Sequence, residues 1–143
     1  MTINYLVQIA VKSDKKTIKQ FYKRQHYSAS FMGFDTVYFI KHNDAVIAAV
    51  IISQIKKCNS QYFLHALVVD KQYRNCGLAT QLLKYHHIHA QQITCFAATQ
   101  LKELYLNANY YLASSKQLNE TNFLRYQQYQ KSKPNLQVFI KQL

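Results

Sequence analysis

The sequence predicts one α/β domain, built on a mixed sheet of about six to seven strands with a central parallel βαβ pair and flanking helices. Strand-like and helix-like runs alternate along its 143 residues. Between residues 62 and 98 a strand, a helix and a strand follow one another, which predicts two parallel strands joined by a right-handed crossover. The length and the 49% of apolar residues suit one core, so we expect residues 1–143 to form a single domain.

The N-terminal part of the chain predicts a strand, a helix and a hairpin. Residues 3–11 alternate between apolar and polar positions, as a strand does. Ser13 and Asp14 can cap the next helix, which is expected to end near residue 27. The apolar face of this helix consists of Ile18, Phe21 and Tyr22. The runs TVYFI and AVIAAVIIS, joined by the turn residues HND, predict two hairpin strands.

The βαβ pair comes next. Residues 62–69 are rich in Leu and Val, which predicts a strand. Apolar residues such as Leu78 and Leu82 then recur at helical spacing up to about residue 90, and residues 93–98 are again strand-like.

A second short helix and two closing strands complete the expected order. Residues 101–108 carry apolar positions at helical spacing, with Thr99 as a cap. Residues 110–113 and 136–140 are strand-like. The connection NETNFLRYQQYQKSKP between them has no clear strand signal, so it is either a functional loop or contains a short helix.

The composition is strongly basic. Eighteen Lys and Arg residues against six Asp and Glu residues give a formal net charge of +12. A polyanion such as RNA is therefore an expected class of partner. The basic residues are spread from Lys12 to Lys141 without one dense run, so a merely solvated basic surface is the alternative.

Several classes of protein are disfavoured. No apolar stretch approaches the roughly 18 residues that span a bilayer, and the N-terminus lacks the pattern of a signal peptide. Cys58, Cys76 and Cys95 are odd in number and contain no CxxC pair, which predicts reduced thiols without a disulfide framework or zinc site. We therefore expect a cytoplasmic protein that has no association with membranes.

The densest group of potential metal ligands is a histidine cluster. His86, His87 and His89 lie within four residues, and two of them at a spacing of three could bind a metal. Acidic and thiol partners are lacking beside them, so we expect no metal site.

One short stretch, DKQYRNCGLATQLLKY, contains Gly77, one of only two glycines in the chain. The first turn of a helix leaves backbone N–H groups unpaired and carries partial positive charge, so a phosphate binds there if the backbone can be approached closely. Arg74, Gly77 and Ala79 match the pattern R/Q-x-x-G-x-G/A, whereas the P-loop and dinucleotide motifs are absent. The alternative is a helix start whose glycine only permits a tight turn.

The context of this turn is that of a known family. LHALVVDKQYRNCGLATQLL resembles the acetyl-CoA-binding core of the GNAT acetyltransferase superfamily, with Val69 five residues before Arg74 as in that pattern. LYLNANYY is similar to the family's FYxxxGF helix end, and the likeness covers nearly the whole chain. The resemblance implies the GNAT fold, acetyl-CoA as co-substrate, and N-acetyltransferase activity by direct attack of a primary amine in a ternary complex.

The resemblance also implies a set of cofactor-binding residues. The pantetheine arm of acetyl-CoA would pair like an extra strand with the backbone of Leu67, Val68 and Val69. The pyrophosphate would be held by the amides of Arg74, Asn75, Cys76, Gly77, Leu78, Ala79 and Thr80. Two positions depart from the family pattern: Asn109 stands at the usual glycine, which is tolerable because Asn also adopts left-handed caps. Ala98 stands near a position where many members have asparagine.

Two residues are candidates for acid–base catalysis. Tyr105 stands at the family's tyrosine position and could protonate the departing thiolate, although its place on an apolar helix stripe is also that of a core residue. None of the six acids lies within residues 62–69, where many members carry a glutamate. His65 lies there instead, in a run that resembles arylalkylamine acetyltransferases, and titrates in the range that a base needs. A buried core histidine is the alternative.

We expect the acceptor to be a small-molecule amine or an amine on a protein or aminoacyl group, bound by a monomer or homodimer. Scarce acids argue against a polyamine. Two other classes compete with the enzyme: a basic module that binds nucleic acid or ribosomes, supported by the charge and by twelve tyrosines, and a CoA-binding domain without catalysis.

Overall fold

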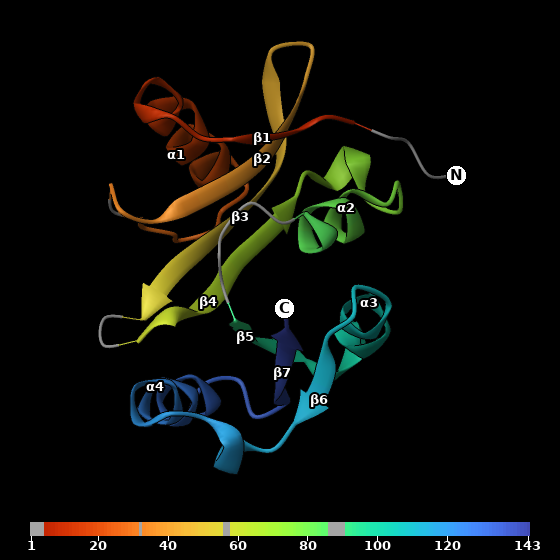
Figure 1. The fold of residues 1–143 in the computed structure, drawn as a ribbon. Helices are drawn as coiled ribbons and strands as arrows, with labels where there is room; N and C mark the ends of the chain where they lie inside the picture. The colour runs from red at the N-terminus through yellow and green to blue at the C-terminus, as the bar shows by residue number, and fades with distance from the viewer. Residues whose placement is uncertain (1–4, 32, 56–57, 86–90) are drawn as a thin grey trace. The chain divides into compact units, whose positions relative to one another are not determined.

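The computed structural model describes residues 5–31, 33–55, 58–85 and 91–143. Figure 1 shows the order of its strands and helices. The strands are β1 (Val7–Ile9), β2 (Thr36–His42), β3 (Ala45–Ile55), β4 (Cys58–Val69), β5 (Gln92–Ala98), β6 (Tyr111–Ala113) and β7 (Leu136–Gln142). The α-helices are α1 (Lys15–Arg24), α2 (Leu78–Lys84), α3 (Lys102–Asn107) and α4 (Glu120–Gln130). Short 3₁₀ turns are η1 (Lys12–Asp14), η2 (Lys71–Tyr73), η3 (Thr99–Leu101) and η4 (Ser115–Gln117).

This architecture confirms the predicted mixed α/β fold. Seven strands form an open sheet in the order β1-β2-β3-β4-β5-β7-β6, and β4, α2 and β5 follow one another as the predicted βαβ unit. The first strand is shorter than predicted, and α2 ends at Lys84 within the described residues. The connection without a strand signal contains α4, so the short-helix interpretation of that segment is confirmed.

The chain divides into two compact units. The first unit comprises Met1–Ser53 and Leu64–His87, and the second comprises Gln54–Phe63 and Ile88–Leu143. Each unit is described by itself below.

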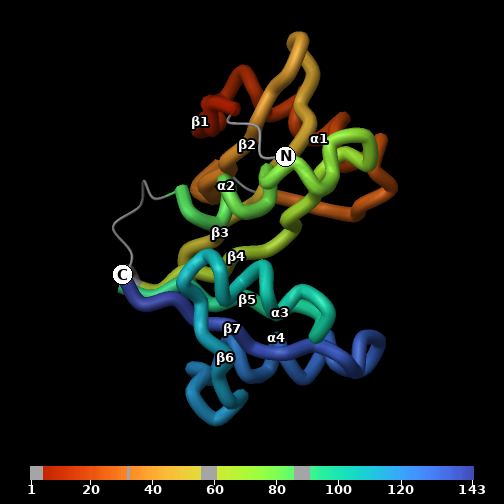
Figure 2. The backbone as a smooth tube through the Cα atoms, turned by 90° about the vertical axis from the view of Figure 1, so that its right-hand side faces the viewer, coloured from red at the N-terminus to blue at the C-terminus, as the bar shows by residue number. Residues whose placement is uncertain are grey.

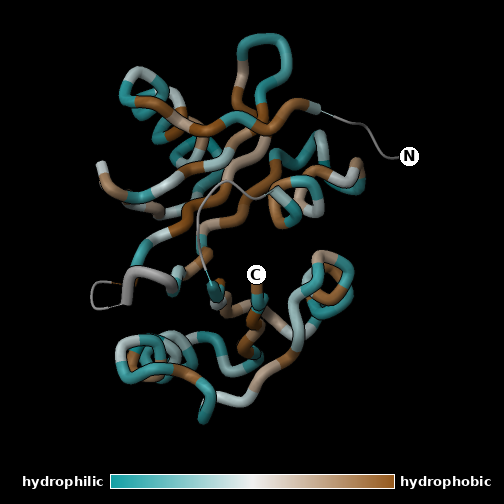
Figure 3. The backbone as a smooth tube through the Cα atoms, viewed as in Figure 1, coloured by the Kyte–Doolittle hydropathy of each residue, from teal (hydrophilic) through white to brown (hydrophobic). Residues whose placement is uncertain are grey.

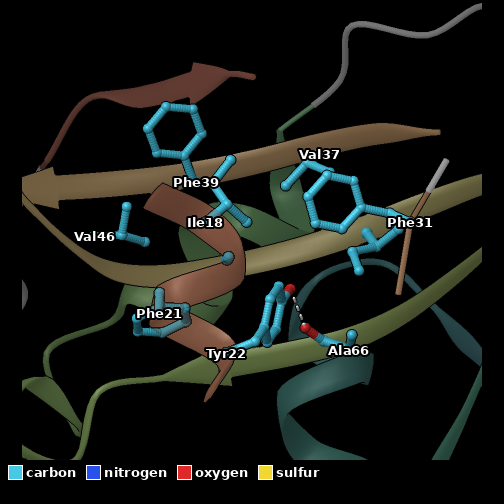
Figure 4. Packing of buried hydrophobic residues seen from close by; sticks show 10 residues of the cluster. Ile18, Phe21, Tyr22, Phe31, Val37, Phe39, Val46 and Ala66 are labelled. Atoms are coloured by element: carbon cyan, nitrogen blue, oxygen red, sulfur yellow. Dashed lines mark hydrogen bonds between the residues drawn. The ribbon is translucent and has the colours of Figure 1, made fainter. Parts of the chain in front are cut away.

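In the first unit, α1 packs its apolar face against a hairpin. β1 pairs antiparallel with β2, and β2 pairs antiparallel with β3, with Val37 opposite Ile51. Asn43 and Asp44 both have positive φ values, 52° and 64°, as the tight turn predicted there requires. Figure 3 shows hydrophilic residues at this turn and hydrophobic ones along the strands. The core cluster includes Ile18, Phe21, Tyr22, Phe31, Val37, Phe39 and Val46 (Figure 4).

In the second unit, β7 lies between β5 and β6 and is antiparallel to both (Figure 2). Cys95 of β5 is opposite Phe139 of β7, so these two side chains leave the same face of the sheet. Tyr105 of α3 stacks on Phe139, with ring centroids 5.1 Å apart. Phe96, the next residue of β5, therefore leaves the other face, where its ring packs 5.1 Å from that of Tyr126 in α4. α3 and α4 thus cover opposite faces.

Candidate functional site

An irregularity interrupts β4 immediately before the residues assigned to the pantetheine arm. Ala66 has a φ of 57°, which is left-handed and uncommon for a residue other than glycine. Its carbonyl oxygen accepts a hydrogen bond of 2.7 Å from the buried Tyr22 hydroxyl (Figure 4). A left-handed residue inside a strand bends it and disturbs its regular pairing. Leu67, Val68 and Val69 follow this point, and each is partly exposed.

The turn between β4 and α2 is built by side chains that bond its backbone. Asp70 Oδ1 accepts a hydrogen bond from the amide of Gln72, and Gln25 donates to the other carboxylate oxygen at 3.1 Å. Arg74 Nε donates to the carbonyl of Val69 at 3.3 Å. These contacts hold both ends of the stretch that precedes the glycine.

Gly77 has the conformation for which a glycine is needed. Its φ is 82°, and Asn75, two residues earlier, has a φ of 63°. Two left-handed residues around Cys76 turn the chain sharply into α2, which begins at Leu78. The first amides of α2 have no carbonyl partner within the helix. The tight-turn interpretation of Gly77 is thereby confirmed in its geometry, and the phosphate role stays a prediction.

The candidate phosphate residues differ in exposure. Arg74 and Asn75 are exposed, and Cys76, Gly77, Ala79 and Thr80 are partly exposed. The side chain of Leu78 is buried, so this residue can offer a ligand only its backbone. Cys76 has a free thiol, as predicted from the sequence.

His65 forms a hydrogen-bonded pair that the sequence did not indicate. Its Nε2 lies 2.8 Å from the hydroxyl oxygen of Ser53, a residue of β3, and both side chains are partly exposed. Nothing in the spacing of 12 residues predicts this pair, because it depends on how β3 and β4 face each other. A hydroxyl on one ring nitrogen orients the imidazole and selects its tautomer.

Tyr105 lies in an aromatic environment within the second unit. It is 3% exposed, its ring stacks on Phe139, and it meets the ring of Tyr110 edge-on at 5.5 Å. Burial raises the pKa of the Cys95 thiol to about 12, while a hydrogen bond with Tyr105 acts in the opposite direction. The partner Cys95 could not be found from the sequence. This environment suits a core tyrosine, and the catalytic role of Tyr105 stays a prediction.

The end of α3 agrees with the expectation for Asn109. This residue has a φ of 69°, the left-handed conformation that lets it stand at the family's glycine position. The backbone amide of Tyr110 donates to the carbonyl of Tyr105 at 3.0 Å and closes the helix.

The sequence-predicted residues are divided between the two units. His65, Leu67 to Val69 and the turn that contains Gly77 belong to the first unit, whereas Tyr105 and Ala98 belong to the second.

Two further features of the described residues are their potential metal ligands and the length and polarity of their helices. No group of three His, Cys, Asp or Glu side chains among them could hold a metal ion, and His86, His87 and His89 lie outside the described residues. In the part of the chain that the structure describes, every helix is too short or too polar to cross a bilayer.

Several solved structures have a fold similar to that of this chain. Escherichia coli ElaA is 12% identical, with a TM-score of 0.69 over 97% of this chain and 100% of that one. Arabidopsis thaliana Naa50, solved with the bisubstrate analogue CoA-Ac-MVNAL, is 13% identical, with a TM-score of 0.63 over 96% of this chain and 99% of that one. At these identities the likeness shows a shared fold.

Part of a longer protein is similar as well. N-acetylglutamate synthase from Neisseria gonorrhoeae, solved with coenzyme A and N-acetyl-glutamate, is 14% identical, with a TM-score of 0.66 over 99% of this chain. The present chain spans only 36% of that protein's length. None of the curated proteins matches the sequence significantly.

The sequence itself matches a family model. The model described as the acetyltransferase (GNAT) family covers residues 4–111, which is more than half of the chain and includes β4, the turn with Gly77, and α3. The chain therefore belongs to the acetyltransferase (GNAT) family, a family of acyl-CoA N-acyltransferases.

Proposed function

We propose that the protein transfers the acetyl group of acetyl-CoA to a primary amine by direct attack in a ternary complex. Family membership supports acyl transfer from an acyl-CoA. The observation that carries the proposal for this chain is the left-handed Gly77 at the start of α2, within the pattern formed with Arg74 and Ala79. A side chain at position 77 would stand where the pyrophosphate must approach the backbone.

The first unit would hold the co-substrate. The partly exposed backbone of Leu67, Val68 and Val69 would pair with the pantetheine arm, directly after the irregularity at Ala66. The amides from Arg74 to Thr80 would bond the pyrophosphate. Arg74 is exposed, so its guanidinium can also neutralise phosphate charge.

His65 and Tyr105 are proposed as base and acid. Amide formation needs a neutral amine, and His65, oriented by Ser53, would remove the amine's proton directly or through water. The C–N bond forms, the C–S bond breaks, and the thiolate that leaves takes a proton. Tyr105 is proposed to donate that proton. This assignment requires that both units act together as one domain over residues 1–143, which we propose as well.

The acceptor is proposed to be a small-molecule amine or the amine of a protein or aminoacyl group. Among the proteins of similar fold, the N-acetylglutamate synthase was solved with N-acetyl-glutamate and Naa50 with the bisubstrate analogue CoA-Ac-MVNAL. We propose that the protein acts in the cytoplasm as a monomer or homodimer and requires no metal.

A CoA-binding domain without catalysis is the second candidate. The burial of Tyr105 and its hydrogen bond with Cys95 favour this candidate, because both are typical of a core residue. The two functions agree on acetyl-CoA binding and differ in turnover.

The test is a titration followed by an assay. Acetyl-CoA should raise the melting temperature saturably, and no stabilisation at millimolar concentration would contradict both candidates. Release of free thiol with a panel of amino acids, peptides and aryl amines would then establish transfer. Stabilisation without thiol release from any amine would favour the non-catalytic domain.

A further inference from the structure

The outer face of α1 carries a row of lysines. Those of the helix, Lys15, Lys16, Lys19 and Lys23, fall within an arc of about 100° at 100° per residue. The row from Lys15 to Lys23 is about 12 Å long at 1.5 Å per residue. The adjacent arc of the helix, with Ile18, Phe21 and Tyr22, is buried in the core. Helical periodicity thus places these charges on one side of α1.

These lysines border one shallow depression of about 600 Å³. The depression is lined by Lys12, Lys15, Lys16, Lys19, Gln20 and Lys23, a set that we call the lysine face. Lys15 is partly exposed and the other members are exposed. The chain has no acidic residue between Asp14 and Asp35, and the Asp14 carboxylate accepts a hydrogen bond from the amide of Val11. Within α1 itself no acidic residue offsets the positive charge of this face.

We propose that the lysine face is a docking surface for single-stranded RNA. Lysine is a common phosphate-contacting residue, and a row of ammonium groups along one helix can follow one phosphodiester backbone. A single strand is bound by a positively charged surface that follows its backbone, without insertion of a helix into a groove. This function is separate from acetyl transfer and does not depend on it.

Other partners fit this face less well. A helix that lies on a membrane presents apolar residues beside its basic ones, but Ile18 and Phe21 are fully buried. A protein partner needs apolar or aromatic anchors in the centre of the interface, where lysine is depleted. The lining of this face consists of five lysines and Gln20, without an apolar or aromatic residue.

Gln20 favours RNA over DNA. Its exposed amide offers both a donor and an acceptor beside the row of lysines. The ribose 2′-hydroxyl is likewise both donor and acceptor and is the group that distinguishes RNA from DNA.

The test compares two triple variants with equal loss of charge. Lys12→Gln/Lys16→Gln/Lys23→Gln removes three members of the face and spares Lys15 and Lys19, whose ammonium groups lie 5.9 and 5.7 Å from the Phe31 ring centroid. The control variant replaces three exposed lysines of the second unit by Gln, namely Lys116, Lys131 and Lys133.

Affinity for a fluorescein-labelled oligouridylate of about twelve nucleotides is measured by anisotropy between about 50 and 200 mM salt, without acetyl-CoA. In the first triple variant, the slope of log K against log salt should become shallower by about 2, since each lysine contributes about 0.7. The control should keep the wild-type slope. Equal changes in both variants would overturn the proposal, because they would report net charge alone. Circular dichroism melting establishes that both variants are folded.

Two further arms test the partner. The wild type should bind the oligouridylate more tightly than the matching oligodeoxyuridylate, which lacks only the 2′-hydroxyls, and Gln20→Ala should remove that preference. Equal wild-type affinities would overturn the assignment to RNA. Polyglutamate of matched charge should compete poorly. If it displaces the oligouridylate as well as unlabelled RNA does, or if anionic vesicles do, the face is not an RNA-docking surface.

Discussion

The hydroxyl of Tyr22 donates a hydrogen bond of 2.7 Å to the carbonyl oxygen of Ala66, the left-handed residue inside β4. Both residues are buried, and Figure 4 shows the bond crossing from α1 to the strand. α1 thereby supports the irregular point of β4 that precedes the proposed cofactor-binding backbone.

Tyr22→Phe should destabilise the protein by about 1–3 kcal/mol, because the variant leaves a buried carbonyl without its donor while keeping the ring. Urea unfolding measures the change. Tyr27→Phe is the control, since Tyr27 is 40% exposed and its ring lies 5.9 Å from that of Tyr22. Equal stability of Tyr22→Phe and wild type would show that the bond contributes little.

The same pair predicts a pH dependence. Burial, and to a lesser extent Tyr27, raises the pKa of the Tyr22 phenol above its ordinary value of about 10. The folded state thus holds this proton more tightly than the unfolded state. Its contribution to stability is complete below pH 10 and is lost as pH rises above 10, by up to about 1.4 kcal/mol per unit. Between about pH 9.5 and 11, the free energy of unfolding of Tyr22→Phe should fall less than that of the wild type in the same urea assay.

Gly77→Val should weaken acetyl-CoA binding at least tenfold and reduce stability by roughly 1–2 kcal/mol, because a β-branched residue is strained at a φ of 82° and would obstruct the phosphate. Isothermal titration calorimetry measures the affinity. Gly33→Ala is the matched control: a Cβ there has no neighbour within 4 Å, so affinity and stability should not change. A folded Gly77→Val protein with wild-type affinity would contradict the phosphate role.

His65→Ala should flatten the acidic limb of the kcat/KM profile against pH, because the base that must be neutral is lost. Ser53→Ala should shift that limb without removing it, since the Ser53 hydroxyl lies 2.8 Å from Nε2 of His65 but is not itself the proposed base. Steady-state kinetics over about pH 5–9 test both variants. An unchanged limb in His65→Ala would assign the base to another group.

Tyr105→Phe should lower kcat by roughly 10² or more, with acetyl-CoA affinity near the wild-type value, if the hydroxyl protonates the leaving thiolate. If Tyr105 is only a core residue, the loss of its hydrogen bond with Cys95 should lower stability by about 1 kcal/mol and leave turnover intact. Thiol-release kinetics and thermal melting with and without acetyl-CoA separate these results. Earlier melting with normal turnover would reject the catalytic assignment.

Much of the fold was predictable from local patterns. Nearby residues by themselves predict the backbone conformation in three places. These are the strands β2 and β3, the turn at Asn43 and Asp44, and the turn that contains Gly77. The left-handed conformation of Asn109 agrees with its place at the usual glycine of the family motif that the chain resembles.

Other features arise only where distant segments meet. The sequence did not predict α4 clearly, because residues 119–134 are largely polar and have no strong apolar pattern. In the structure Tyr126 and Tyr129 of this helix pack on Phe96, and such packing stabilises a helix that its own sequence pattern does not. The left-handed conformation of Ala66 could not be read from an alanine in a strand-like run. It depends on the Tyr22 hydroxyl, 44 residues away along the chain.

The sequence by itself determined the family, the order of the strands and helices other than α4, and the glycine turn, because each is encoded in a short run of residues. Only the tertiary structure decided which distant side chains meet, as Ser53 does with His65 and Cys95 does with Tyr105. The physical reason is that a side chain's partner and exposure depend on sheet register and helix packing, which bring together residues that no local pattern relates.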